Sequence, residues 1–251
     1  MKKKILLVIC LISCWVGFAQ ANFQGKITYR ISTKKTTKKR LDSVLKNTDL
    51  GSKKMNIFFS KMMRGGTDVE GFLQFSNGES IYQLEDKMIV DGKRKLNITR
   101  MRAGASKIYY RNTITNNNFY QTRQTELLLI ESIPIKWKIT QETKKIGIYI
   151  CYKAIDINST NKKQQPIAWF TPQIPVNFGP HRYFGLPGLI LEVDTFGLLT
   201  TATSIVLNPK KKIKIKKPTK GKKITAKEYL EITKKFFRNL DREIKKDKTK
   251  N

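Results

Sequence analysis

The chain has 251 residues, with 50 Lys and Arg against 19 Asp and Glu, and therefore carries a formal net charge of +31. Hydrophobic residues make up 39% of the sequence and aromatic residues 10%, which excludes a chain that is disordered throughout. The length fits one large domain, and the frequent Ile, Thr, Tyr, Phe and Val residues favour a β fold.

The positive charge has two interpretations. A strongly basic surface attracts polyanions and anionic membrane surfaces without specificity. However, the basic residues are mostly Lys, and Asn and Ile are also abundant, a usage that AT-rich coding alone produces. The charge therefore predicts non-specific affinity for polyanions or an anionic membrane surface, and no specific nucleic-acid partner.

The N-terminus has the pattern of a secretory signal peptide. Lys2, Lys3 and Lys4 precede an apolar run over 5–18, and Ala19-Gln20-Ala21 has the small-x-small form of a cleavage site. We therefore predict a signal peptide over residues 1–21 and export to the periplasm, the outer membrane or the extracellular space. No later apolar run approaches membrane-spanning length, so no transmembrane helix is expected in the mature chain.

A second processing signal overlaps the first. Leu11-Ile12-Ser13-Cys14 resembles a bacterial lipobox, which would make the chain a lipoprotein through Cys14. The apolar residues 15–18 that follow are unlike the polar linker that lipoproteins usually carry. After ordinary cleavage only Cys151 remains, which excludes an intramolecular disulfide, and its place in an apolar run predicts a buried thiol.

Alternating apolar and polar residues predict a mainly β fold with a few α-helical additions. Short polar connections and turn signals such as Asn77-Gly78 favour an antiparallel meander that forms a curved sheet or open barrel. The segment 33–54 is Lys-rich and predicts a short helix or ordered loop, and polar residues 140–145 predict a hairpin connection. The expected strands are 23–31, 55–63, 69–76, 80–84, 87–90, 107–111, 119–123, 126–133, 135–139, 146–151, 167–171, 189–193 and 198–207, with 126–133 a candidate central strand.

The C-terminal part is basic and ends in a predicted helix. Ile213 and Ile215 alternate with lysines, which favours a charged edge strand. Thr225 and Glu228 have the spacing of a capping box. The amphipathic helix that follows is expected to pack on the sheet, because its aromatic stripe is wide enough to need burial; the alternative is that it lies on an anionic membrane surface. Its apolar stripe consists of Tyr229, Thr233, Phe236, Phe237, Leu240 and Ile244. We expect one domain over 22–244 and a disordered basic tail over 245–251.

One motif is specific. The hexapeptide Gly185-Leu186-Pro187-Gly188-Leu189-Ile190 follows Trp169 and Gly179-Pro180. This segment resembles the GLPGLI family of exported Bacteroidota proteins, and residues 25–29 and 149–154 are also similar to that family. The resemblance implies no known activity, substrate or cofactor. Because many members are encoded near outer-membrane transport systems, it implies a cell-envelope role with an outer-membrane transporter or other envelope protein as partner.

The motif has a structural and a functional interpretation. Pro187 restricts φ and the two glycines permit positive φ, so a tight loop that leads into a buried strand explains the hexapeptide. Alternatively, the loop before it forms a ligand or partner surface, since Arg182 beside two aromatic residues suits an anionic or sugar-like ligand. The predicted surface consists of Trp169, Gly179, Pro180, His181, Arg182, Tyr183 and Phe184.

No motif for catalysis or metal binding is present. The sequence has no HExxH, no CxxC, no phosphate-binding Gly-rich loop and no Gly-x-Ser-x-Gly. His181 is the single histidine and cannot form a His-rich zinc site. We therefore predict no catalytic residue, no metal and no cofactor, and His181 is expected to be solvated or structural.

Three functions remain open. The first is a non-catalytic binding or accessory protein of the envelope. The second is a periplasmic carrier of a lipid or other apolar ligand in the cavity of the curved sheet. The third is a hydrolase that uses His181 with Glu192 or Asp194, two carboxylates that flank Val193 and so share one face of a strand.

Overall fold

The computed structural model describes residues 23–34, 66–85, 97–159, 165–195, 197–235 and 238. The predicted signal peptide with Cys14, most of the segment 33–54, the expected strands 55–63 and 87–90, and the tail 245–251 lie outside these residues. Phe236, Phe237, Leu240 and Ile244 of the predicted helix stripe lie outside them as well.

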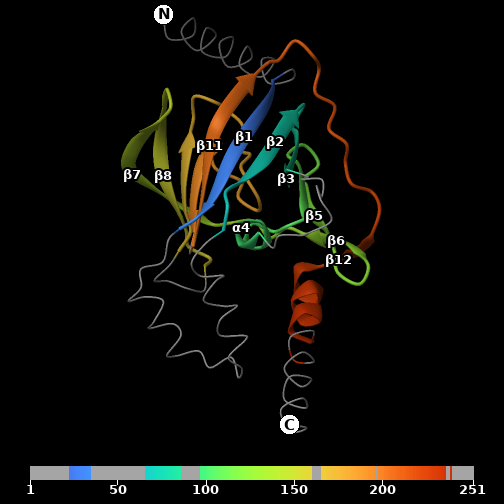
Figure 1. Ribbon diagram of the computed structural model, residues 1–251. Coiled ribbons are helices and arrows are strands. Elements are labelled where there is room, and N and C mark those ends of the chain that lie inside the picture. Colours follow the sequence, from blue (N-terminus) through green and yellow to red (C-terminus); the bar gives the residue numbers. More distant parts are fainter. Residues whose placement is uncertain are drawn as a thin grey trace, which may run out of the picture.

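Twelve strands form one curved, open sheet in the order β12-β6-β5-β4-β3-β2-β1-β11-β10-β9-β8-β7 (Figure 1). The mainly β prediction is confirmed. The strands are β1 (Gln24–Thr33), β2 (Val69–Ser76), β3 (Glu79–Leu84), β4 (Ile108–Asn112), β5 (Asn117–Arg123), β6 (Leu127–Glu131), β7 (Trp137–Ile146), β8 (Tyr149–Asp156), β9 (Ile167–Thr171), β10 (Leu189–Thr195), β11 (Leu198–Leu207) and β12 (Lys222–Ile224).

The sheet consists of two antiparallel meanders that meet in its centre. Strands β1 to β6 extend in one direction and strands β11 to β7 in the other. The two meanders are joined where β1 pairs with β11, from Gly25↔Leu207 to Thr33↔Leu198. The strand nearest the N-terminus is therefore central, and its partner lies more than 160 residues further along the chain.

Two hairpin turns were predicted from the sequence. The turn signal Asn77-Gly78 located the first correctly, whereas the polar residues 140–145 did not locate the second. Asn77 and Gly78 both have positive φ and connect β2 to β3 as predicted. In contrast, residues 140–145 are not a connection but part of β7, and the turn falls at Gly147, with φ +58°. The prediction was wrong because β7 is an edge strand and is solvated on much of its surface, so polar residues there do not indicate a loop.

The C-terminal part crosses the sheet as an irregular strap, residues 209–221, which runs down one side in Figure 1. Ile213 is buried and Ile215 packs against Tyr110 and Phe119, so both isoleucines anchor the strap instead of forming the predicted edge strand. The edge is β12, which pairs with β6 in parallel. Strand β6 is thus next to the edge and not central.

Two helices complete the described part of the fold. The short helix α4 (Ile98–Arg102), which the sequence did not predict, begins at Asn97, whose side chain accepts a hydrogen bond from the Arg100 amide. The predicted C-terminal helix covers 226–235 of the described residues. Thr225 and Glu228 form the expected capping box, with Thr225 N donating to Glu228 Oε2 at 2.7 Å and Glu228 N donating to Thr225 Oγ1 at 3.2 Å.

The C-terminal helix contacts the sheet at its first turn. The Tyr229 ring packs edge-on against Tyr120 of β5, with ring centroids 6.0 Å apart, and its hydroxyl accepts a hydrogen bond from Gln124 at 3.1 Å. Further along, Leu230 and Ile232 are 51% and 41% exposed. Among the described residues, no helix has both the length and the apolar character needed to cross a bilayer.

The core lies on what we call the inner face of the sheet, the face that carries Tyr29, Leu73 and Tyr82. The segment 172–188, between β9 and β10, packs on this face through Ile174, Phe178 and other buried side chains. The opposite, outer face carries Phe72, Ile81 and Ile108, and the strap crosses it. The chain therefore covers both faces of the first meander with its own loops.

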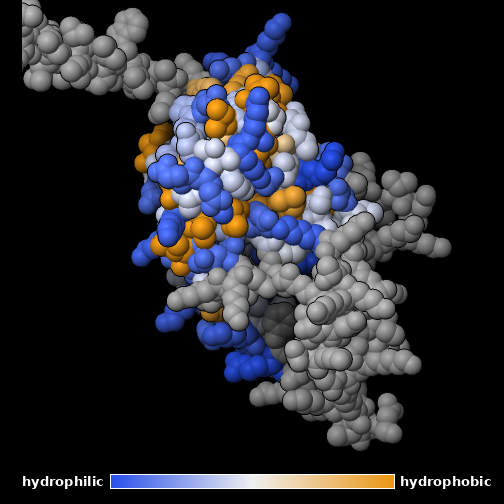
Figure 2. All heavy atoms as spheres, turned by 90° about the vertical axis from the view of Figure 1, so that its left-hand side faces the viewer, coloured by the Kyte–Doolittle hydropathy of each residue, from blue (hydrophilic) through white to orange (hydrophobic). Residues whose placement is uncertain are grey.

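Beyond the strap, the β7–β8 side of the molecule has a mixed surface. Figure 2 shows hydrophobic residues interspersed with hydrophilic ones over this face. Ile139, Ile148 and Ile150 are exposed there, whereas Cys151 is buried as predicted, and burial raises the pKa of its thiol to about 11. Since the thiol is protonated at neutral pH, it is a packing residue rather than a nucleophile.

Candidate functional site

The hexapeptide forms the predicted tight loop into a core strand. Gly185 and Gly188 have φ of +89° and +158°, and Leu186 is 1% exposed. Leu189 is fully buried and opens β10, and its amide donates to the Ile174 carbonyl at 3.0 Å. The hexapeptide thus connects the loop on the inner face to a buried strand.

The segment just before the hexapeptide lies on the inner face and is mostly enclosed. Gly179, Pro180 and Tyr183 are buried, and His181 and Phe184 are half-buried. Only the side chain of Arg182 is largely accessible, at 58%, and it donates to the buried carboxylate of Asp156 at 3.3 Å. The segment thus offers little besides one guanidinium to an external ligand.

Trp169 is separated from this segment. Its neighbours on β9, Ala168 and Phe170, pack with Tyr183 on the inner face. Because side chains alternate along a strand, the indole points away from Tyr183; it packs against the other core cluster, and the Lys144 ammonium lies 4.4 Å from the ring centroid. The seven residues predicted as one surface therefore do not form a single surface.

The imidazole of His181 is uncharged and faces hydroxyl groups. Its Nε2 atom lies 3.3 Å from the Tyr82 hydroxyl and 3.5 Å from Thr200 Oγ1, and the Tyr82 ring centroid is 4.8 Å from the imidazole. Burial lowers the pKa of the imidazole from 6.5 to about 4. The side chain is therefore uncharged at neutral pH and has hydroxyl groups as partners.

The two carboxylates considered with His181 lie on the other face. Glu192 pairs with Lys144 at 2.5 Å and accepts a hydrogen bond from Thr201 at 3.1 Å, and Asp194 pairs with Lys34. Thr200 faces His181 and Thr201 faces Glu192, so successive residues of β11 separate the base from the carboxylate. This arrangement provides no His–carboxylate dyad for hydrolysis.

Arg111 is a site residue that sequence analysis missed. It is 3% exposed, its Nη2 donates to the His181 carbonyl at 3.3 Å, and its guanidinium lies 3.8 Å from the centroid of Phe184. Within the described part of the chain, its Nη1 atom is buried without a hydrogen-bond partner. Arg111 thus fixes the loop 179–184. Because the two segments are far apart in the chain, no local sequence pattern predicts this contact.

Trp137 of β7 anchors the same loop from the other side. Its Nε1 donates to the Phe184 carbonyl at 2.8 Å, and its ring packs against Tyr183 at a centroid distance of 6.2 Å. Arg111 and Trp137 therefore fix the loop that carries His181 from opposite halves of the sheet.

Substitution Trp137→Phe tests this anchor. We expect a loss of about 1–2 kcal/mol in the free energy of unfolding, because the Phe184 carbonyl loses a buried donor and some apolar area is lost. Urea unfolding of the mature chain measures the effect. Trp169→Phe is the matched control, since no hydrogen bond from its indole joins it to the loop; equal losses for both variants would contradict the anchoring role.

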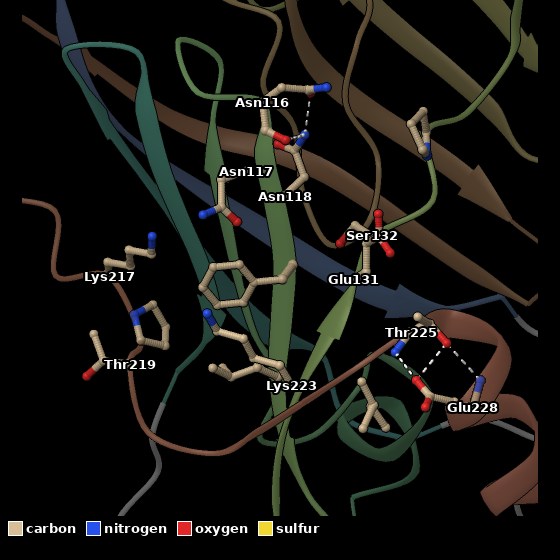
Figure 3. A pocket seen from close by; sticks show the side chains of 15 residues that line it. Asn116, Asn117, Asn118, Glu131, Ser132, Lys217, Thr219, Lys223, Thr225 and Glu228 are labelled. Carbon is tan, nitrogen blue, oxygen red and sulfur yellow. Dashed lines mark hydrogen bonds between the residues drawn. The ribbon is translucent and has the colours of Figure 1, made fainter.

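Two adjoining hollows lie on the outer face, on either side of the strap. The first, which we call the lysine hollow, has a volume of about 640 Å³. The second, the polar hollow, has a volume of about 610 Å³ and is shown in Figure 3. Lys217, Pro218 and Thr219 of the strap line both, so the strap divides one groove.

The polar hollow is lined by amides, hydroxyls and charges of both signs. Figure 3 shows Asn116 to Asn118 on one side, Glu131 and Ser132 of the β6 end on another, and Glu228 at the start of the helix. Ser132 is buried, and its hydroxyl has no hydrogen-bond partner among the described residues. Buried polar groups rarely lack a partner, so this wall is suited to a polar ligand.

The lysine hollow carries charge of one sign. Lys214, Lys216, Lys217 and Lys220 line it, together with apolar and amide side chains, and no Asp or Glu of the described residues does. The whole strap contains seven lysines and no acidic residue. In the described part of the chain, none of these seven ammonium groups lies within 4 Å of a carboxylate. Their charge is therefore available to an external anion.

A third hollow, of about 410 Å³, lies beside the hexapeptide. Leu186, Pro187 and Gly188 line it with Phe23 and Phe75. Its walls carry no ionisable side chain. Over the described residues, no group of three or more His, Cys, Asp or Glu side chains is arranged to hold a metal ion.

The fold and the groove define an open, curved β-sheet protein with a basic strap. A family model described as a protein of unknown function (Porph_ging) matches residues 156–192, which include β9 and the hexapeptide. No curated protein matches the sequence. The matched segment is thus the part of the chain that the hexapeptide loop organises.

Solved structures with a similar fold exist. A structure titled as PNGF-II in space group C2 has a TM-score of 0.50 and 15% sequence identity, covering 83% of this chain and 32% of that chain. A structure of PNGF-II in space group P21 gives a TM-score of 0.49 with the same identity and coverage. This chain therefore spans about a third of the length of the protein it resembles, and at this identity the likeness concerns the fold alone.

Proposed function

We propose that this chain is an exported, non-catalytic binding protein of the cell envelope, and that its strap face holds an anionic ligand. The observation that carries the proposal is the charge of the strap: four of its seven lysines line the two hollows, and none of the seven pairs with a carboxylate among the described residues. Clefts with charge of one sign raise the local concentration of oppositely charged ligands. Export and the envelope location rest on the signal-peptide pattern and on the resemblance to the GLPGLI family.

The inner face supports a carrier function less well. The segment 172–188 fills it with side chains such as Ile174 and Phe178, which are 0% and 3% exposed. An apolar ligand in the curve of the sheet would have to displace these residues. The separation of His181 from Glu192 and Asp194 likewise gives the hydrolase alternative no supporting geometry.

The binding proposal can be tested with heparin as an anionic probe. We expect the triple variant Lys214→Gln, Lys216→Gln and Lys220→Gln to bind heparin about tenfold more weakly, since exposed charge pairs contribute about 0.5 kcal/mol each. The difference should shrink at high ionic strength, where exposed charges are screened. Titration calorimetry of the mature chain measures both effects.

The matched control removes the same charge elsewhere. Lys136, Lys138 and Lys145 are exposed residues of the β7 side, so their replacement by Gln lowers the net charge equally without touching the strap. Equal loss of heparin affinity in both triple variants would mean that only net charge matters and would refute a strap site. Thermal unfolding of each variant verifies that the fold is retained.

Association with an outer-membrane transporter or other envelope protein is a further part of the proposal, supported by the family resemblance. An acidic surface on such a partner would complement the strap. In a pull-down from envelope extract, we expect the wild-type chain and the β7-side variant to retain a transporter that the strap variant loses. Retention by all three would place the contact elsewhere.

A further inference from the structure

The floor of the lysine hollow is unusually apolar for an outer face of a sheet. Phe72 of β2, Ile81 of β3, Ile108 of β4 and Leu127 of β6 line it, and all four are half-buried. Amide side chains stand between them, for example where Gln83 pairs with Phe72. The floor therefore combines apolar area with uncharged polar groups and no carboxylate.

The roof of the hollow is basic and held in position. The Gln24 side chain accepts a hydrogen bond from the Ile213 amide at 2.8 Å, at the start of the strap. Towards its end, Gln121 of β5 donates to the Lys220 carbonyl, also at 2.8 Å. Ile213 and Ile215 add apolar anchors. The lysines between these points stand over the floor on a fixed backbone.

The volume and the charges restrict the ligand. A volume of about 640 Å³ is in the range of pockets that hold one small molecule. The adjoining polar hollow has Glu131 and Glu228 in its walls, which oppose an anion, whereas the lysine hollow has four lysines and no acid. An anionic group with an apolar chain satisfies both the roof and the floor.

We propose that the lysine hollow binds a single-chain anionic amphiphile, a free long-chain carboxylate, with its chain on the floor of Phe72, Ile81, Ile108 and Leu127 and its head group among the strap lysines. This inference rests on the proposed function for the anionic head group. The inference goes beyond the proposed function by assigning an apolar chain to the ligand, a group that heparin lacks. The alternative is that the alkyl stems of the lysines themselves cover the floor.

The test is a series of straight-chain carboxylates from hexanoate to tetradecanoate, titrated below their micellar concentrations into the mature chain. Each CH₂ that reaches the floor should lower Kd about fourfold, the equivalent of about 0.8 kcal/mol per buried CH₂, until the floor is filled. Methyl esters of the same chains should bind more weakly. Absence of any chain-length dependence, or equal binding of esters and carboxylates, would overturn the inference.

Variants separate this inference from the proposed function. The pair Ile81→Gln and Ile108→Gln should abolish the chain-length dependence and leave heparin binding unchanged. Ile150→Gln, at an exposed position of β8, is the matched control and should change neither. If heparin binding is lost only in the strap variant while carboxylates show no chain-length dependence, the inference fails and the proposed function stands. If carboxylates show the chain-length dependence while heparin does not bind, the amphiphile site stands and the anionic ligand of the strap face is not a polyanion.

Discussion

Replacing Gly188 by Ala is expected to destabilise the protein by about 3–4 kcal/mol, near the upper end for single substitutions. A Cβ atom at this position would lie 2.2 Å from the Thr171 carbonyl oxygen and 2.8 Å from the Pro172 nitrogen. These are backbone atoms at the end of β9, so they cannot rotate away as a side chain would. The start of β10 or the end of β9 would have to shift.

The shift would propagate because β9 and β10 are paired strands of the core. Leu189, the next residue, is fully buried, and its amide donates to the Ile174 carbonyl. A lost contact here therefore loosens the loop that covers the inner face. Urea unfolding of Gly188→Ala at neutral pH measures the loss.

Gly185→Ala is the internal control. Gly185 also has positive φ, at +89°, but a Cβ there would meet no atom within 4 Å. Only the backbone preference against the left-handed region opposes the substitution, at about 1–2 kcal/mol. If both variants lost the same free energy of unfolding, the close approach of the Thr171 backbone would not explain why position 188 requires glycine.

Acidification is expected to weaken the fold through His181. Burial lowers the pKa of the imidazole to about 4 in the folded chain, against an ordinary value of 6.5 in the unfolded chain. Between these two values the unfolded chain binds a proton that the folded chain does not, so stability falls as the pH drops through this window. From about pH 7 to about pH 4.5, the contribution of His181 should fall by roughly 2.5 kcal/mol.

The variant His181→Asn isolates this effect from the carboxylates. Asn tolerates the left-handed backbone of this position, where φ is +52°, and does not titrate. We expect the variant to lose roughly 2.5 kcal/mol less than the wild type over the same interval, even if it is less stable at neutral pH. Identical pH dependence in both proteins would show that the imidazole is not protonated on unfolding in this range.

The sequence was most informative where local patterns and tertiary environment agree. Period-2 alternation located β2 at its observed bounds, since one face of that strand packs on the core and the other does not. Thr225 and Glu228 predicted a helix start that depends only on neighbouring residues. The pattern gave wrong predictions for 140–145, a solvated edge strand, and for Ile213 and Ile215, which anchor the strap. Whether a strand is at an edge, and where a strap packs, depends on residues far away in the chain.

The candidate site illustrates the same division. The sequence located the loop 179–184 and the hexapeptide, and these are neighbours in the structure. It grouped Trp169 with them, although strand alternation turns the indole away from Tyr183 and toward Lys144. Arg111 and Trp137, which hold the loop, are separated from it by more than 40 residues, so no local pattern linked them.

The β class, most strand positions, the helix cap and the basic character of the C-terminal part could be predicted, because they depend on composition and on neighbours along the chain. Long-range packing was needed to show that β1 and β11 join two meanders, that His181 faces hydroxyl groups, and that the strap lysines stand over an apolar floor. These features arise from contacts between residues far apart in the chain, which strand periodicity and charge counts do not encode.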